Sequence, residues 1–167
     1  MSPEKHIYFV RHAKSDWRDA DDLHDRDRSL KPRGIRDGER MAQHLRQRDV
    51  CPDLFISSDA FRAAQTAVLF MRQLGIRTLE VTAELYLSDV EAFFSTIRTL
   101  DRDVRCVLLF GHNPTMNEIL ERFGDGGHVP SCGVQHYTYA GSWMEFQPEL
   151  MDFEGLTIPA ELPGRVS

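Results

Sequence analysis

The stretch Ile7–His12 reads Ile-Tyr-Phe-Val-Arg-His, an apolar run of strand length that ends directly in two polar residues. After a polar loop, a helical pattern over Pro32–Gln47 follows, with proline in the favoured first position. The same order of strand and helix recurs in Leu54–Ile56 with Phe61–Leu74, Leu79–Val81 with Val90–Leu100, and Val104–Phe110 with Pro114–Phe123. This alternation predicts an α/β fold, a three-layer α/β/α sandwich with a mainly parallel central sheet.

The C-terminal part of the sequence has a weaker pattern. Gly133–Tyr139 and Trp143–Phe146 are predicted as strands that can form a hairpin across Ala140–Ser142, and the residues from Pro148 onward show no regular pattern. No internal repeat or linker divides the sequence. We therefore expect one domain over residues 1–167, with a core of about residues 6–147 and a C-terminal tail.

The composition narrows the possible classes of protein. Of 167 residues, 41% are hydrophobic and 28% are charged, and the longest apolar runs are far too short to span a membrane. We see no signal-peptide pattern, and three cysteines without a CxxC pair are typical of a reducing compartment, so we expect a cytoplasmic protein. The net charge of −6 argues against general binding to nucleic acid or anionic membranes, although a few local arginines can still bind an anionic substrate.

Polar residues follow each of the predicted parallel strands. Arg11 and His12 follow the first strand, Arg62 lies just past the second, Glu84 past the third and His112 past the fourth. Because the carboxyl ends of parallel strands meet at one edge of the sheet, we expect these side chains to converge there. Guanidinium groups and helix N-termini both favour oxyanions. The sequence therefore predicts a phosphate-binding site at this edge.

Three motifs at these strand ends resemble a known family. Arg11-His12-Ala13 is similar to the Arg-His-Gly signature of the histidine phosphatase (phosphoglycerate-mutase-like) superfamily, Ser57–Thr66 to its Ser-Ser-Pro-x-x-Arg-Ala-x-Gln-Thr segment, and Gly111–Pro114 to its second-histidine motif. Arg28–Gly34 resembles the Arg-Pro-Leu-Thr-x-x-Gly run before the family's first helix. The resemblance extends in order from Ile7 to Phe123, and the short chain is most similar to the SixA-type phosphohistidine phosphatase branch.

The resemblance implies a phosphatase that works through a phosphohistidine intermediate. It makes His12 the nucleophile, while Arg11, Arg62 and His112 neutralise the phosphoryl oxygens. No metal ion and no cofactor are required, because the protein itself supplies the positive charge. The further residues expected to bind the substrate are Ser15, Arg28 and Asn113.

The general acid is an open point. Glu84 is the first choice, since relatives that act on phosphate esters carry their acid after the third strand, and Asp16 and Asp19 are alternatives in the loop after His12. A phosphohistidine can leave as neutral imidazole when its ring is already protonated, so an ambiguous acid favours phosphohistidine on a protein as the substrate. The charged run Asp25–Arg28 is typical of a solvated loop, although its arginines could also line the entrance to the site.

Two residues depart from the family pattern. Ala13 replaces the usual glycine, which makes the backbone beside His12 less permissive, and Asp59 replaces the usual proline. The Asp59 carboxylate is expected near Arg62, so a structural salt bridge between these two is an alternative role for the arginine.

Two other functions stay open at this point. A phosphatase for small phosphate esters would depend strictly on Glu84. A non-catalytic module that binds phosphate or a phosphoprotein would use Arg11 and Arg62 but would not need His12 for turnover.

Overall fold

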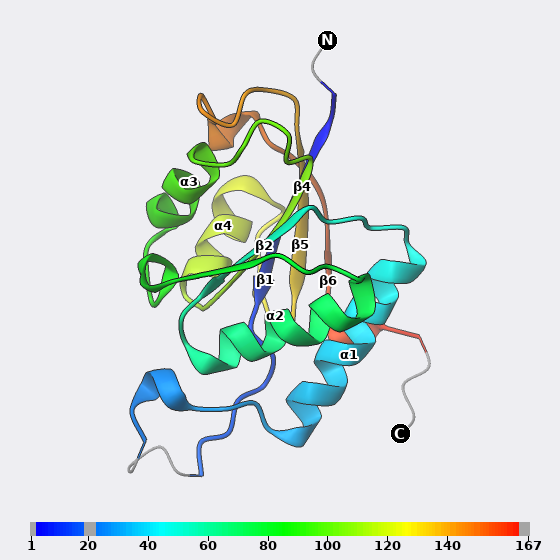
Figure 1. The fold of residues 1–167 in the computed structure, drawn as a ribbon, viewed down its shortest axis with the longest axis vertical. Helices are drawn as coiled ribbons and strands as arrows, with labels where there is room; N and C mark the ends of the chain where they lie inside the picture. Colours follow the sequence, from blue (N-terminus) through cyan, green and yellow to red (C-terminus); the bar gives the residue numbers. More distant parts are fainter. Residues whose placement is uncertain (1–2, 19–22, 164–167) are drawn as a thin grey trace.

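The computed structural model describes residues 3–18 and 23–163 (Figure 1). Within these ranges one sheet has the strand order β3-β2-β4-β1-β5-β6. The strands are β1 (Lys5–Arg11), β2 (Leu54–Ser58), β3 (Leu79–Thr82), β4 (Cys106–Gly111), β5 (Val134–Tyr139) and β6 (Asp152–Thr157). The pairs among β1 to β4 are parallel, whereas β5 and β6 add antiparallel pairs at one edge. The mainly parallel sheet that the alternation predicted is therefore confirmed.

Helices cover both faces of the sheet. They are α1 (Pro32–Gln47), α2 (Phe61–Leu74), α3 (Val90–Arg98) and α4 (Thr115–Phe123). The first two lie on one face and the last two on the other, which confirms the three-layer sandwich (Figure 1). Successive side chains of β1 point to opposite faces of the sheet. Ile7 and Phe9 pack with α3 and α4, and Tyr8 and Val10 pack with α1 and α2. In the described ranges, no helix is both long and apolar enough to cross a membrane.

The C-terminal part differs from the prediction. Trp143–Phe146 is not a strand, because the Trp143 ring is buried in the core and its Nε1 donates a hydrogen bond to the carbonyl oxygen of Val104 at 2.9 Å. The last strand comes instead from the supposed tail, where β6 pairs with β5. A register shift after His136 and the positive φ of Gly155 (153°) interrupt the alternation of side chains, which hides this strand in the sequence. The sheet therefore extends beyond the expected core of residues 6–147.

The pairing of β1 with β4 positions the predicted site. Arg11, the last residue of β1, pairs with Gly111, the last residue of β4. The residues that follow, His12 and His112, therefore lie side by side beyond the carboxyl ends of the strands. β2, which ends at Ser58, flanks β4 on its other side. Three separate segments thus meet at one edge of the sheet.

Candidate active site

His12 lies immediately after β1, and its side chain is buried. Its Nδ1 contacts the carbonyl oxygen of Ala13 at 2.7 Å, and its Nε2 lies 3.3 Å from the Nε of Arg62, which donates to it. Together these contacts assign the ring proton to Nδ1 and leave the lone pair on Nε2. Burial lowers the pKa of His12 to about 3, so the ring is neutral near neutral pH. This is the form of imidazole that can act as a nucleophile.

His112 lies beside His12, with the two ring centroids 5.2 Å apart. Its Nε2 is 2.8 Å from the Oγ of Ser58, and that oxygen also accepts a hydrogen bond from the N–H of Ala60 at 3.1 Å. The Ser58 hydroxyl proton is then free to bind Nε2, which leaves the ring proton of His112 on Nδ1. That buried Nδ1 has no hydrogen-bond partner among the described residues. Burial, and to a lesser extent Arg62, lowers the pKa of His112 to about 4, so the ring is a neutral donor.

Two arginines bring guanidinium groups to these histidines. Arg62 lies in the first turn of α2, and it donates from Nη1 to the carbonyl oxygen of Asp25 at 2.7 Å and from Nη2 to the Asp25 carboxylate at 3.1 Å. Arg11 donates from Nη1 to the carbonyl oxygen of Val129 at 2.9 Å. Because fixed acceptors hold both groups, little side-chain freedom is lost when they bind an oxyanion.

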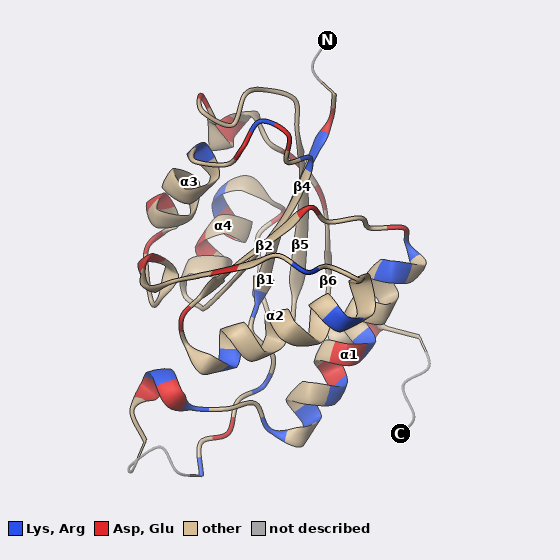
Figure 2. Ribbon diagram, viewed as in Figure 1, with Lys and Arg blue, Asp and Glu red and all other residues tan. Residues whose placement is uncertain are grey.

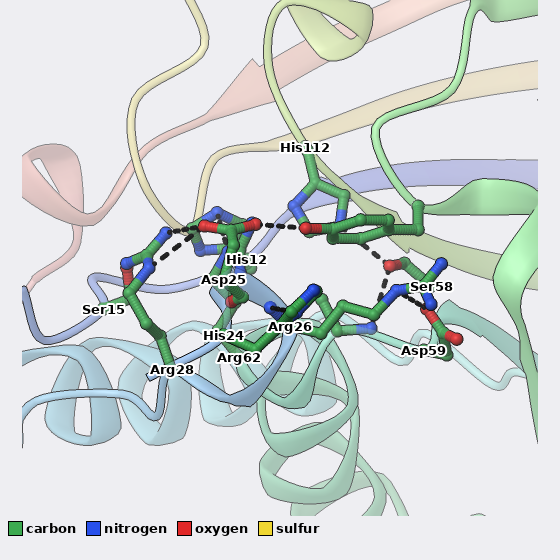
Figure 3. Close-up of polar contacts among 12 residues, drawn as sticks. His12, Ser15, His24, Asp25, Arg26, Arg28, Ser58, Asp59, Arg62 and His112 are labelled. Atoms are coloured by element: carbon green, nitrogen blue, oxygen red, sulfur yellow. Dashed lines mark hydrogen bonds and ion pairs between the residues drawn. The ribbon is translucent and has the colours of Figure 1, made fainter. Parts of the chain in front are cut away.

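The loop between β1 and α1 adds a carboxylate that the sequence analysis did not assign to the site. Asp25 accepts hydrogen bonds from Arg62, from the Nε of Arg28 at 3.2 Å and from the hydroxyl of Tyr86 (Figure 3). Burial would raise the pKa of Asp25, but the bonds from Tyr86 and Arg62 outweigh it and lower that pKa to about 2. Asp25 is therefore an anion that holds two arginines. The expectation of a solvated loop is wrong for Asp25 and for the buried Arg28.

These groups line a cleft of about 390 Å³. The predicted residues that line it are Arg11, His12, Ser15, Arg28, Arg62, His112 and Asn113. Among the described residues, its lining contains five Arg or Lys side chains and one carboxylate, so the cleft attracts anions in spite of the net negative charge. Ser15 is held in the lining by Arg28, whose Nη1 donates to its Oγ at 2.5 Å. In the same parts of the chain, no three His, Cys, Asp or Glu side chains are grouped as metal ligands.

Two of the three predicted general acids, Glu84 and Asp16, do not line this cleft. Glu84 is exposed and lies outside the lining, whereas Tyr86, two residues later, contacts Asp25. Asp16 is also outside the lining and is bound by Arg18 at distances from 2.5 to 3.0 Å, and these bonds lower the pKa of Asp16 to about 2. Asp19 lies outside the described residues.

The two departures from the family pattern are accommodated. Ala13 is buried, and its φ is not among the positive values, so the position does not require glycine. Asp59 pairs with Arg26, from Nε to Oδ1 at 3.4 Å, while the carboxylate paired with Arg62 is that of Asp25. In the described part of the chain, the alternative salt bridge between Asp59 and Arg62 is therefore not found.

Comparison with known proteins gives the family. A model of the histidine phosphatase superfamily (branch 1) matches residues 7–103. The chain belongs to this superfamily. An uncharacterized protein of Mycobacterium leprae is 26% identical over 164 residues, which cover 90% of this chain and 99% of that protein.

Solved structures agree with this assignment. The crystal structure of a provisionally named phosphohistidine phosphatase SixA from Agrobacterium tumefaciens is 29% identical, covers 93% of this chain and 98% of its own, and has a TM-score of 0.78. Phosphoglycerate mutase from Bacillus anthracis, 16% identical over 92% of each chain, shares the fold with a TM-score of 0.65. The motif resemblance is thus confirmed: this histidine phosphatase is a SixA-like member with a phosphoglycerate mutase-like fold.

Proposed function

We propose that this histidine phosphatase hydrolyses phosphohistidine on a protein, through a phosphohistidine intermediate on His12 and without a metal ion. The observation that carries the proposal is the fixed tautomer of His12, with Nδ1 bound to the carbonyl of Ala13 and Nε2 available beside Arg62. A neutral, oriented nucleophile among cationic side chains is what phosphoryl transfer requires.

Two steps account for the reaction. First, Nε2 of His12 attacks phosphorus, and an N–P bond forms as the bond to the leaving group breaks. Arg11, Arg62 and the Nδ1–H of His112 stabilise the non-bridging oxygens, and one of these oxygens takes over the hydrogen bond from Arg62 to His12. Water then attacks phosphorus, the new N–P bond breaks, and neutral His12 is regenerated. The protons of the water leave with the inorganic phosphate.

The state of the carboxylates in the cleft supports phosphohistidine as the substrate. Asp25, the one carboxylate that lines the cleft within the described residues, is ionised because its pKa is about 2. An alkoxide leaving group needs a proton as it departs, whereas a phosphohistidine with a protonated ring leaves as neutral imidazole. The site therefore suits cleavage of an N–P bond better than cleavage of an alkyl phosphate ester.

We further propose a cytoplasmic location and a single domain over residues 1–167. Cys51, Cys106 and Cys132 are free thiols, and the last two are buried, which suits a reducing compartment. The six named strands belong to one sheet, which supports a single domain.

The test compares wild type with His12→Ala for phosphate release from a phosphohistidine-bearing phosphotransfer protein and from an aryl phosphate, both in EDTA. We expect wild type to act on both, with the higher kcat/KM for the phosphoprotein. Loss of the nucleophile should lower both activities by at least about 10³-fold. The matched control is His44→Ala, a histidine on α1 outside the cleft lining, which should keep wild-type rates.

Each failure would have a different meaning. Full activity in His12→Ala would exclude the covalent intermediate. Activity on the aryl phosphate alone would favour a phosphatase for small esters. Activity that EDTA removes and a divalent cation restores would contradict the metal-independent mechanism. Phosphate binding without any turnover would favour the non-catalytic module.

A further inference from the structure

A second hollow opens beside the catalytic cleft. It has a volume of about 360 Å³ and shares Arg11, Lys14 and Ser131 with the cleft. The rest of its lining includes Arg33, Asp37 and Arg40 of α1 and residues 158–160, which follow β6. We call this space, between α1 and residues 158–160, the side hollow. A substrate that is bound at His12 and is larger than the catalytic cleft can reach it past the shared residues.

Basic side chains dominate the charge of the side hollow. Arg33 and Arg40, both on α1, pair with Asp37 at N–O distances of 3.9 and 3.5 Å. Arg11 and Lys14 add two more cations, so four cationic side chains accompany one carboxylate in the lining. Figure 2 shows that α1 carries several basic residues together with acidic ones. The side hollow is thus electropositive, although the whole chain has a net charge of −6.

The lining of the side hollow also contains apolar residues. Pro130, Ile158 and Pro159 contribute to it. The volume is close to that of the catalytic cleft and within the range of sites that hold whole ligands, so it exceeds what a lone phosphate group fills. A lining of cations and apolar residues suits acidic side chains together with the chain that carries them.

We propose that the side hollow binds an acidic segment of the polypeptide that carries the phosphoryl group. The inference rests on the proposed function, because it assigns a protein substrate to the adjoining cleft. Arg33 and Arg40 line the side hollow but not the catalytic cleft. They therefore contribute to substrate affinity and not to the chemistry at His12.

Charge reversal on α1 provides a matched pair of variants. Arg33→Glu acts on the side hollow, and the Arg33 side chain is 54% exposed, so the change does not disturb the core. Arg36→Glu is the control, because Arg36 is an exposed arginine on the same helix that lines neither space. Arg40→Gln removes a second lining charge without reversing it.

Binding is measured by fluorescence anisotropy in the His12→Ala background. The probes are labelled short peptides with a phosphotyrosine flanked either by glutamates or by glutamines. We expect the glutamate peptide to bind about tenfold more tightly than the glutamine peptide, a preference that Arg33→Glu abolishes and Arg40→Gln weakens. Arg36→Glu should leave the preference within about twofold of the background protein.

Three results would overturn the proposal. The first is equal affinity for the two peptides. The second is an equal loss of the glutamate preference in Arg36→Glu and Arg33→Glu. The third is that binding of a small bisphosphate ester depends on Arg33 while binding of the peptides does not. Turnover of a phosphohistidine protein by the enzyme with His12 intact tests the proposed function separately. A glutamate preference without that turnover would refute the phosphohistidine substrate and support the acidic-segment site. Turnover without the glutamate preference would support the phosphohistidine substrate and refute the acidic-segment site.

Discussion

The strand ends and the loop between β1 and α1 build the active site in different ways. At the strand ends, His12 and His112 follow neighbouring strands, so the backbone pairing of the sheet sets their relative position. In the loop, Ser15, Asp25 and Arg28 are held by side-chain bonds, and both basic partners of Asp25 depend on its one carboxylate. The sheet places the reacting atoms, and the loop orients the charges around them.

Because of this difference, substitutions in the two regions should have different effects. A strand end moves only if a cooperative ladder of backbone hydrogen bonds is disrupted, whereas the loop depends on a few polar contacts. We therefore expect substitutions at the strand ends to remove chemistry and substitutions in the loop to misplace charge while turnover continues.

The largest effect in this comparison should come from Arg62, and Arg28 of the loop provides the contrast. Arg62→Ala removes the donor that contacts Nε2 of His12, and it should lower kcat/KM for an aryl phosphate by about 10²–10³-fold. Arg28→Ala removes a cation of the loop that does not contact His12, and it should cost about tenfold. Steady-state kinetics with folding checked by circular dichroism compares them. Equal losses would remove the distinction between the two regions.

The strand ends should also make stability depend on pH. His12 and His112 have pKa values of about 3 and about 4 in the folded protein, below the value of 6.5 for an ordinary histidine, chiefly because they are buried. At pH values between the folded pKa of each histidine and 6.5, the unfolded chain binds a proton that the folded chain does not. The two histidines therefore do not change the unfolding free energy above about pH 7.5, and they lower it as the pH drops below 6.5. At about pH 4.5, each of these histidines should lower the unfolding free energy by about 2.5 kcal/mol.

Urea unfolding at about pH 7.5 and about pH 4.5 measures this loss for wild type and for His12→Gln. The variant should lose less stability on acidification, by about 2.5 kcal/mol, because one buried neutral imidazole is gone. His128→Gln changes an exposed histidine and should match wild type. Identical losses in wild type and His12→Gln would contradict the low pKa of His12.

Asp25 tests how the loop orients the charges of the site. Asp25→Asn weakens the hold on Arg62 and Arg28 and also removes an anion from a cationic cleft. We expect kcat for an aryl phosphate to fall by about tenfold because the guanidinium groups are less well oriented, while KM decreases because the dianion meets less repulsion. The control is Asp27→Asn, because Asp27 is an exposed residue of the same short 3-10 helix (Asp25–Asp27) within the loop. An increase in KM with unchanged kcat would show that the carboxylate supports binding and not orientation.

The same contrast explains how much could be predicted from sequence. Strand runs and helical spacing are local patterns, so they predicted the layers and placed Arg11, His12, Arg62 and His112 at one edge. β6 was missed because its register shift breaks the local period.

Asp25 and Tyr86 were missed because their role comes from how the loop folds against other elements. The three-residue spacing of Asp25 and Arg28, which form an ion pair, is the only trace of this arrangement in the sequence. Local sequence patterns thus predict the site residues whose positions are set by the backbone of strands and helices. Residues that are placed by side-chain contacts between distant segments need the structure.

Glu84 gives the smallest expected effect and tests the limit of the strand-end rule. It follows β3, as the rule requires, but it is the middle residue of a short 3-10 helix (Ala83–Leu85), and its side chain is exposed, outside the cleft. Glu84→Gln should therefore change kcat/KM for an aryl phosphate by less than about twofold, as expected for a surface substitution. Tyr86→Phe, which removes a hydrogen bond to Asp25, should lower kcat by about threefold. A loss of tenfold or more in Glu84→Gln would mean that this carboxyl donates a proton during turnover, and it would favour small phosphate esters as substrates.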